Sequence, residues 1–149
     1  MFSGRYDHAI DDKGRVSIPA RFREVLQRGG HESMIITNQF ISREPCLELY
    51  PPDEWATLIE KLRERPRFDP RVQAFETFYI AGAHELSVDR QGRILIPTHL
   101  REHAKLEKEV TFSANHALFQ LWNKALLDKV RQASIEQMMD PEFHAKLGI

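Results

Sequence analysis

The feature that most constrains the fold of this chain is an internal repeat. The stretch DDKGRVSIPARFRE, which begins at Asp11, returns as DRQGRILIPTHLRE, which begins at Asp89. The two stretches share Asp, Gly, Arg, Ile, Pro, Arg and Glu in the same order and at the same spacing, and Val16 and Phe22 are replaced conservatively by Ile94 and Leu100. Chance does not preserve such a series, so the chain contains two copies of one structural unit.

Each copy has the pattern of a β-hairpin. An alternating stretch, RYDHAI or HELSV, leads into an Asp-x-x-Gly-Arg turn, and a second alternating stretch, RVSIP or RILIP, follows the turn. Gly14 and Gly92 stand where such a turn needs a positive φ. Asp11 and Asp89 can accept hydrogen bonds from the amides of the turn. We therefore expect these four residues to shape two similar turns.

The rest of each copy also repeats. Pro19 and Pro97 suit the first position of a short helix. The stretches SMIITNQF and CLELY predict a second pair of strands, matched by EVTFSA and ALFQLW, and the stretches PPDEWATLIEKL and NKALLDKVRQ predict helices. Each half thus reads strand, strand, helix, strand, strand, helix, which predicts an α+β fold of tandem duplicated β-hairpin/helix units.

The chain divides into four segments on this interpretation. We predict a first half at residues 1–65, a connecting helix at 66–82 and a second half at 83–132. Asp69 and Pro70 favour the start of the connecting helix, whose apolar residues recur at helical spacing, so we expect it to pack and to join the halves into one rigid body. The tail at 133–149 fits a short docking helix or a frayed end, and the sequence leaves both open.

Composition excludes several classes of protein. The chain has 149 residues, 42% of them hydrophobic and 29% charged, which is typical of a globular protein. No apolar run approaches the roughly 20 residues needed to cross a bilayer, and no signal peptide is evident, so we expect a cytoplasmic protein. The single cysteine, Cys46, lies in a predicted strand and is expected to be a core thiol. The net charge of −1 argues against indiscriminate coating of nucleic acid.

The sequence gives no support for catalysis, a metal or a cofactor. The histidines are scattered; His99 and His103, four apart on a predicted helix, are the exception, but no third ligand accompanies them. No glycine-rich phosphate-binding motif occurs. The adjacent Asp11 and Asp12 are better explained as a turn residue and a solvent-exposed neighbour than as an acid pair. We therefore expect neither an enzyme nor a bound cofactor.

Positive charge is concentrated around the two turns. Lys13 and Arg15 lie in the first turn and Arg90 and Arg93 in the second, and further basic residues follow on the helices behind, namely Arg21, Arg23, Arg101 and Lys105. A two-stranded β-ribbon can enter the major groove of DNA, where arginine can bind guanine or phosphate. The alternative is that each arginine only pairs with the aspartate of its own turn, as an exposed ion pair of little consequence for stability. The duplication favours binding.

These residues resemble a known family. The opening MFSG and the two Asp-x-x-Gly-Arg turns, each followed by Ile-Pro and a short helix ending in Arg-Glu, are similar to those of the MraZ family of bacterial transcriptional regulators, and the similarity runs from Met1 to about Gln132. It implies an AbrB-like swapped-hairpin β-barrel with surrounding helices, in which the two halves pair within one chain. It also implies a ring-like homo-oligomer that binds direct repeats of double-stranded DNA upstream of a cell-division and cell-wall gene cluster, chiefly as a repressor associated with the nucleoid.

The resemblance also assigns residues. The Asp-x-x-x-Arg residues of the family correspond to Asp11 and Arg15 in the first turn and to Asp89 and Arg93 in the second. Lys13 matches the basic residue of the first turn, whereas the second turn has Gln91 at that place and its positive charge at Arg90. The DNA-binding residues implied are Lys13, Arg15, Arg90 and Arg93, with the first turn favoured for base contact.

A second hypothesis comes from a different class of protein. The same basic turns could contact an acidic protein, so that the chain would act as an antitoxin-like or scaffold oligomer. Binding that is insensitive to DNA sequence but saturable by a protein partner would distinguish this hypothesis from sequence-specific DNA binding.

Overall fold

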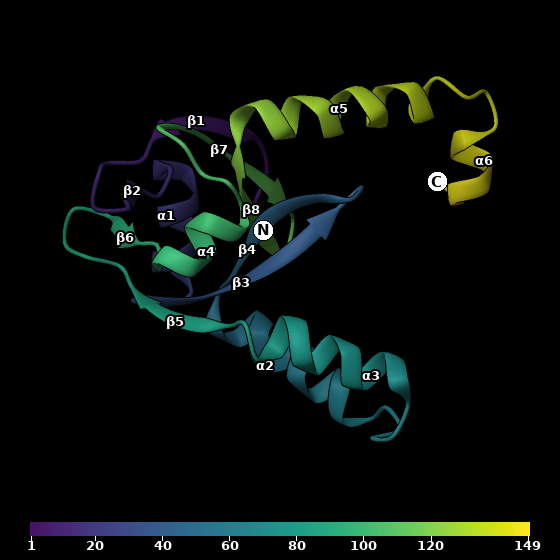
Figure 1. Cartoon of the computed structure of the whole chain (residues 1–149), viewed down its shortest axis with the longest axis horizontal. Coiled ribbons are helices and arrows are strands. Elements are labelled where there is room, and N and C mark those ends of the chain that lie inside the picture. The colour runs from purple at the N-terminus through teal and green to yellow at the C-terminus, as the bar shows by residue number, and fades with distance from the viewer.

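The computed structural model describes all residues, 1–149. The first half contains the strands β1 (Arg5–Ala9), β2 (Arg15–Ser17), β3 (Ser33–Ile41) and β4 (Glu44–Tyr50), with the helices α1 (Ala20–Arg28) and α2 (Pro52–Arg63). The second half contains β5 (His84–Ser87), β6 (Arg93–Leu95), β7 (Glu109–Asn115) and β8 (Leu118–Asn123), with α4 (Thr98–His103) and α5 (Lys124–Met138). The segments α3 (Pro70–Phe75) and η1 (Glu76–Ile80, a π-helical turn) lie between the halves, and α6 (Phe143–Leu147) is the last element (Figure 1). The predicted order of elements and the α+β class are confirmed.

The strand order shows that the two halves are related by an approximate twofold axis. A large antiparallel sheet has the order β1-β7-β8-β4-β3-β5, and a small one consists of β2 and β6. Exchanging each strand for its counterpart in the other half reverses the order of the large sheet and leaves the small one unchanged. The axis therefore passes between β4 and β8 and through the β2-β6 pair.

The pairing around the two turns corrects the sequence prediction. The strands that flank a turn were expected to pair with each other as a hairpin, but β1 pairs with β7, β5 pairs with β3, and β2 pairs with β6 of the other half. In this arrangement Val16 lies opposite its own counterpart, Ile94, and both are 1% exposed. Crossed pairing buries these two short strands in one shared core, which two separate hairpins would not do.

The large sheet also differs from the predicted barrel. Its hydrogen-bonded order leaves β1 and β5 at opposite edges, so the sheet is open. Because β1 and β5 are counterparts, the two edges are equivalent under the internal twofold axis.

The core lies between the large sheet, the β2-β6 pair and the two short helices α1 and α4. These helices begin directly after Pro19 and Pro97, which precede the first helical residue instead of occupying it. Each contributes apolar side chains from one face, and the equivalent pairs Ile18 and Ile96, Phe22 and Leu100, and Leu26 and Ala104 are all buried. The core thus forms around matched residues of the two halves.

The connecting segment packs firmly against the sheet. Asp69 caps α3 by accepting a hydrogen bond from the amide of Arg71 at 2.8 Å. Tyr79 in η1 is 2% exposed and donates a hydrogen bond of 2.6 Å to the buried Glu48 carboxylate on β4, and its hydroxyl also contacts that of Tyr50. Burial beside Glu48 raises the pKa of both tyrosines, that of Tyr50 to about 12.

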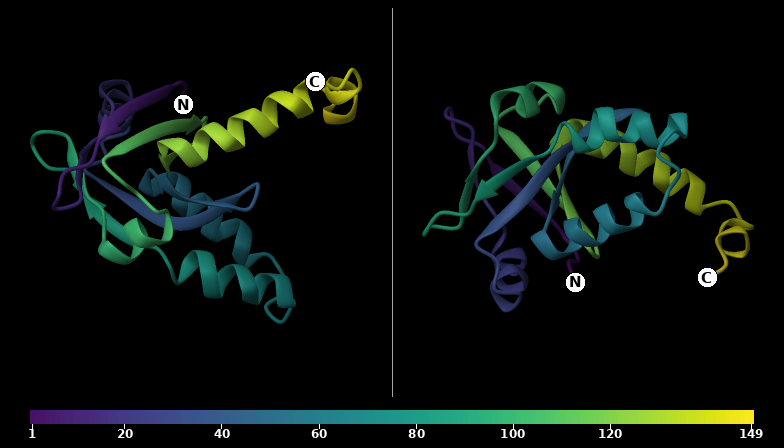
Figure 2. Two further views of the ribbon diagram at one scale, coloured as in Figure 1. Left: turned by 45° about the horizontal axis from the view of Figure 1, so that its top comes forward. Right: turned by 90° about the horizontal axis from the view of Figure 1, so that it is seen from below.

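The C-terminal elements form an arm at the end of the molecule remote from the turns (Figures 1 and 2). The first part of α5 packs on the sheet, where Leu127 and Val130 contact the buried Cys46 and Trp122. The helix was expected to end near residue 132 but runs to Met138, and its last turns expose Ile135, Met138 and Met139. No helix combines the length and the apolar character that crossing a bilayer requires.

Candidate functional site

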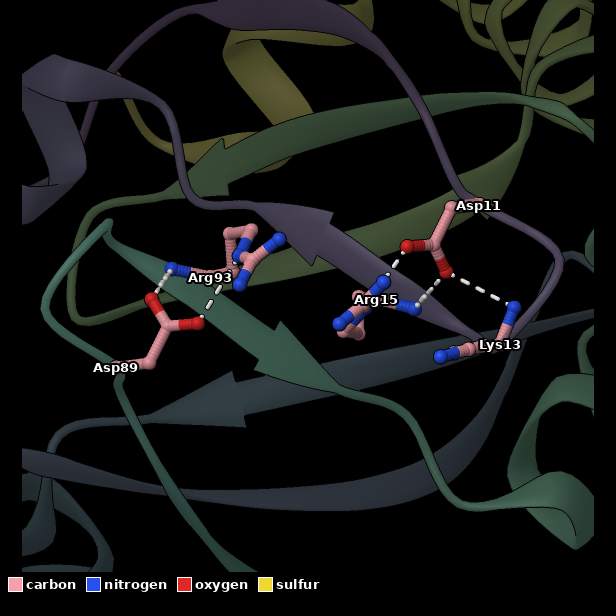
Figure 3. A network of polar contacts seen from close by, with 5 residues as sticks. All are labelled: Asp11, Lys13, Arg15, Asp89 and Arg93. Atoms are coloured by element: carbon pink, nitrogen blue, oxygen red, sulfur yellow. Dashed lines mark hydrogen bonds and ion pairs between the residues drawn. The ribbon is translucent and has the colours of Figure 1, made fainter.

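The first turn is closed by the backbone and the side chain of Asp11. The Asp11 amide donates to the carbonyl of Arg15 at 2.9 Å, and the Gly14 amide donates to the carbonyl of Asp11 at 3.0 Å. Oδ1 of Asp11 accepts hydrogen bonds from the amides of Lys13 (3.0 Å) and Arg15 (2.8 Å), and Oδ2 accepts from Nε of Arg15 at 2.8 Å (Figure 3). The aspartate therefore fixes both the backbone of the turn and the direction of the arginine.

The second turn repeats this network. Oδ1 of Asp89 accepts from the amides of Gln91 (2.8 Å) and Arg93 (2.9 Å), and Oδ2 accepts from Nε of Arg93 at 3.0 Å. Gly14 and Gly92 have φ of +90° and +75°, a region in which residues with a Cβ are strained. Only the residues at the middle of the turns differ in charge.

The hydrogen bonds stabilise the ionised form of both aspartates. The bond from the Arg15 amide is the largest cause, and with the Arg15 side chain and the Lys13 amide it lowers the pKa of Asp11 to about 2. The bond from the Arg93 amide likewise lowers the pKa of Asp89. Both carboxylates are therefore charged at neutral pH and hold their arginines as ion pairs.

The β2-β6 pair presents the two arginines on one outward face. Val16 and Ile94 point into the core, so the alternation along each strand places their neighbours on the opposite face. That face carries Arg15 and Ser17 from β2 and Arg93 and Leu95 from β6, and we call it the ribbon face. Figure 3 shows the two arginines side by side between the two aspartates.

The geometry of the ion pairs leaves part of each guanidinium free. Arg15 lies opposite Leu95, so Arg93 is its diagonal neighbour, a relation for which the separation is typically about 7–8 Å and somewhat less between Cβ atoms. In both ion pairs the aspartate binds Nε, and no protein acceptor binds the two terminal nitrogens. The side chains of Arg15 and Arg93 are 38% and 33% exposed. Two oriented, half-exposed guanidinium groups can thus offer paired donors to an external acceptor.

The other two basic residues predicted for the site, Lys13 and Arg90, lie in the turns that precede β2 and β6. Lys13 is exposed in the first turn, beside Asp11 (Figure 3). Arg90, although exposed, lines a cavity between the second turn and α1, so it does not occupy the place that Lys13 has in the first turn. Figure 3 shows Arg15, Arg93 and Lys13 near one another, whereas Arg90 lines the cavity together with Arg23.

Two further arginines support the turns, and the sequence did not reveal how. A Cβ added to Gly14 would lie 2.7 Å from Cζ of Arg101, and one added to Gly92 would overlap with Cδ of Arg23. Each helix arginine therefore packs on the turn of the opposite half. The repeat identified Arg23 and Arg101 as equivalent, but the crossing of the halves is needed to see which turn each one contacts.

The histidines of α4 do not converge on a common site. His99 Nε2 lies 3.0 Å from His84 Nε2, whereas His103 Nε2 lies 3.0 Å from the carbonyl of Gln39. No group of three or more potential protein ligands is arranged to hold a metal ion.

Comparison with known proteins identifies relatives along the whole chain. A family model described as "MraZ protein, putative antitoxin-like" matches residues 1–78 and again 79–146. A protein of Desulfitobacterium hafniense (strain Y51) named "Transcriptional regulator MraZ" is 43% identical over 150 residues, covering 100% of both chains. Proteins of the same name from Caldanaerobacter subterraneus subsp. tengcongensis and Clostridium tetani are 43% and 36% identical; the first match covers 90% of this chain and 89% of the relative, and the second covers 100% of both.

Proposed function

Because this chain belongs to the MraZ family, we propose that it is a sequence-specific DNA-binding transcriptional regulator, which represses a bacterial cell-division and cell-wall gene cluster by binding direct repeats upstream of it. The observation that carries the proposal is the ribbon face, where Asp11 and Asp89 orient the guanidinium groups of Arg15 and Arg93 and leave their terminal nitrogens free. The relatives are named as regulators, which is not a class of enzyme.

The ribbon face suits the major groove of DNA. The groove is about 12 Å wide and admits a two-stranded ribbon, and an arginine can donate two hydrogen bonds to O6 and N7 of guanine. Arg15 and Arg93 would make base or phosphate contacts, and the exposed Lys13 would bind phosphate. The ion pairs with the aspartates reduce the conformational freedom that each arginine loses on binding.

The crossed β2-β6 pairing supports the swapped-hairpin, AbrB-like fold that the resemblance to the family implies. In this chain, strands from the two halves interleave in the way implied for the swapped hairpins of that fold, and each turn is supported by an arginine of the other half. The two turns are therefore held on one rigid body. Two moderate contact sites so linked bind more tightly than either alone.

We further propose that the chain forms a ring-like homo-oligomer and acts at the nucleoid in the cytoplasm. The exposed apolar residues of the α5 arm support self-association. A ring would present several ribbon faces to an array of repeats, so that avidity compensates for the near-neutral net charge. Light scattering coupled to size-exclusion chromatography tests this part of the proposal, and a monomer at all concentrations would contradict it.

The experiment that tests DNA binding compares the parent with Arg15→Ala at two salt concentrations. The probes are a duplex with four direct repeats and a scrambled duplex of equal length, and the readout is fluorescence anisotropy. Losing a good bidentate base contact costs about 1–3 kcal/mol, so we expect the variant to bind the repeats roughly 5–150-fold more weakly. Its binding to the scrambled duplex should change much less.

Arg63→Ala serves as the matched control, because it removes the same charge from an exposed position on α2, away from the ribbon face. Circular dichroism and the melting temperature show whether both variants remain folded. If folded Arg15→Ala binds the repeats as tightly as the parent, Arg15 has no role in recognition.

A second candidate function is that of an antitoxin-like or scaffold oligomer whose basic turns contact an acidic protein. The description of the matching family as antitoxin-like favours this function. This function predicts weak binding of equal strength to both duplexes, which decreases on both as the salt concentration rises. It also predicts saturable binding of an acidic protein, which Arg15→Ala should lose.

A further inference from the structure

A large cavity lies behind the second turn, outside the ribbon face. It has a volume of about 740 Å³, within the range of ligand sites, and is bordered by α1, by the loop before β3 and by the turn after β5. Arg23 and Arg90 line it together with the hydroxyl-bearing Ser33 and Ser87. The proposed contacts of the ribbon face with DNA leave this cavity unexplained.

Arg23, one of the residues that line this cavity, has an unmet hydrogen-bonding requirement. Its Nε is the one buried side-chain nitrogen or oxygen atom of the protein that has no hydrogen-bond partner. A buried donor without an acceptor is unfavourable, and a charged one more so. Neither Arg23 nor Arg90 forms an ion pair with an acidic side chain.

The equivalent arginine of the other half shows what is missing. Arg101 donates from Nε to the carbonyl of Ile96 at 3.1 Å and from Nη2 to Oγ1 of Thr98 at 3.0 Å. In the first half the place of Thr98 is taken by Ala20, which has no hydroxyl. The first half therefore keeps the arginine, Arg23, but lacks one of the acceptors that bind Arg101 in the second half.

The charges around the two equivalent cavities also differ. Arg101 lines a second cavity beside the first turn, where Asp12 stands at the position that Arg90 holds in the first cavity. The carboxylates of Asp11 and Asp89 are already bonded within their own turns. The exposed Glu32 at the larger cavity is therefore the one acidic group there that no turn arginine neutralises.

We propose that the cavity lined by Arg23 and Arg90 binds a phosphate group. Two unpaired guanidinium groups supply charge-assisted donors, and the hydroxyls of Ser33 and Ser87 can add neutral ones. The phosphate can belong to the DNA backbone or to a free anion, because both present the same oxygens. The site is defined on the free protein and does not depend on sequence-specific DNA binding.

The test is calorimetric titration of the full-length protein with inorganic phosphate at constant ionic strength, maintained with sodium chloride. We expect saturable binding by the parent and about tenfold weaker binding by Arg23→Gln and by Arg90→Gln. Arg90 is exposed, so its variant gives a result even if Arg23→Gln folds poorly. Glu32→Gln should bind phosphate more tightly, because it removes the unneutralised negative charge.

Arg21→Gln is the matched control, since Arg21 lies on α1 but does not line the cavity, and its affinity for phosphate should equal that of the parent. No saturable heat with the parent, or an unchanged dissociation constant in Arg90→Gln, would overturn the proposal. Repeating the titration on the DNA-bound protein identifies the source of the phosphate. Loss of the phosphate response would indicate that the DNA backbone occupies the site, and an unchanged response would indicate a site for a free anion.

Discussion

The two turns have the same geometry but different surroundings. Each has one aspartate that binds two backbone amides and the Nε of an arginine, and each is closed by a glycine with positive φ. The charged residues between these fixed points are not retained, since Asp12 and Lys13 of the first turn correspond to Arg90 and Gln91 of the second. The aspartate and glycine that both turns share orient an arginine. The two residues between them differ and can give each turn a different role.

The helix arginines extend this difference. Arg101, which packs on the first turn, is fixed by two hydrogen bonds, but Nε of Arg23, which packs on the second, has no partner. The first turn therefore rests on an arginine held by two hydrogen bonds and carries the exposed Lys13. The second turn rests on an arginine that lacks these bonds, and for this reason we propose that it contributes to binding a phosphate. Four predictions test this comparison.

The largest effect is expected for the equivalent core residues beneath the turns. Phe22 packs against Tyr6 and Phe119 with ring centroids 5.3 and 4.6 Å apart, whereas the smaller Leu100 occupies the equivalent position. We expect Phe22→Ala to reduce the free energy of unfolding by about 3–5 kcal/mol and Leu100→Ala by about 2–4 kcal/mol, as measured by urea denaturation. Each variant should unfold in one transition, because the halves share a core. Two separate transitions would show that the halves are independent.

The turn glycines should give the next largest effect. An alanine with positive φ costs about 1–2 kcal/mol, and at Gly14 and Gly92 its Cβ would also displace an arginine. We expect Gly14→Ala to be more destabilising than Gly92→Ala, because moving Arg101 breaks two hydrogen bonds and Arg23 has fewer to lose.

Gly30→Ala separates the cost of backbone strain from the cost of displacing an arginine. Gly30 has φ of +71°, but a Cβ there would meet no atom within 4 Å, so this variant measures the backbone strain alone. If Gly14→Ala costs no more than Gly30→Ala in thermal unfolding, Arg101 does not hold the turn in the way described.

Because the sequence repeats, the shared local structure of the two turns could be predicted from the sequence. The turn chemistry of Asp11 and Gly14 and of their counterparts follows from local rules, since both the carboxylate bonds and the positive φ lie within five residues. The order of the elements and the burial of Cys46 followed from periodicity and apolar runs in the same way.

The partners across the molecule were not predictable in this way. A three-residue strand such as β2 carries too little pattern to specify its neighbour, and a local turn is compatible with both hairpin and crossed pairing. The placement of Arg23 over Gly92 and the cavity that Arg23 shares with Arg90 both depend on that crossing. Local chemistry was therefore visible in the sequence, but the contacts between the halves required the structure.

A smaller effect is expected from exchanging the middle residues of the two turns. If Lys13 neutralises one phosphate, Lys13→Gln should reduce the slope of log K against log salt by about one and weaken binding similarly on all DNA sequences. Gln91→Lys should increase the slope if the second turn also reaches the backbone. Lys61→Gln on α2 is the control for the loss of one exposed charge. An unchanged slope in Lys13→Gln, measured by anisotropy titrations at several salt concentrations, would show that Lys13 does not contact phosphate.

The smallest effect concerns the aspartates, and its sign follows from their lowered pKa values. The pKa of Asp11 falls from the ordinary 3.8 to about 2 on folding, and that of Asp89 is also lowered. The contribution of Asp11 to stability is therefore complete above about pH 4 and is lost as the pH falls toward 2, and that of Asp89 likewise decreases as the pH falls below its ordinary pKa. Asp11→Asn and Asp89→Asn should each flatten the dependence of the unfolding free energy on pH in this interval, modestly because both sites are exposed. Asp12→Asn, whose side chain accepts none of the bonds of the turn, should leave the profile as it is. Similar flattening in all three variants would mean that general charge repulsion, and not the bonding within the two turns, determines the acid sensitivity.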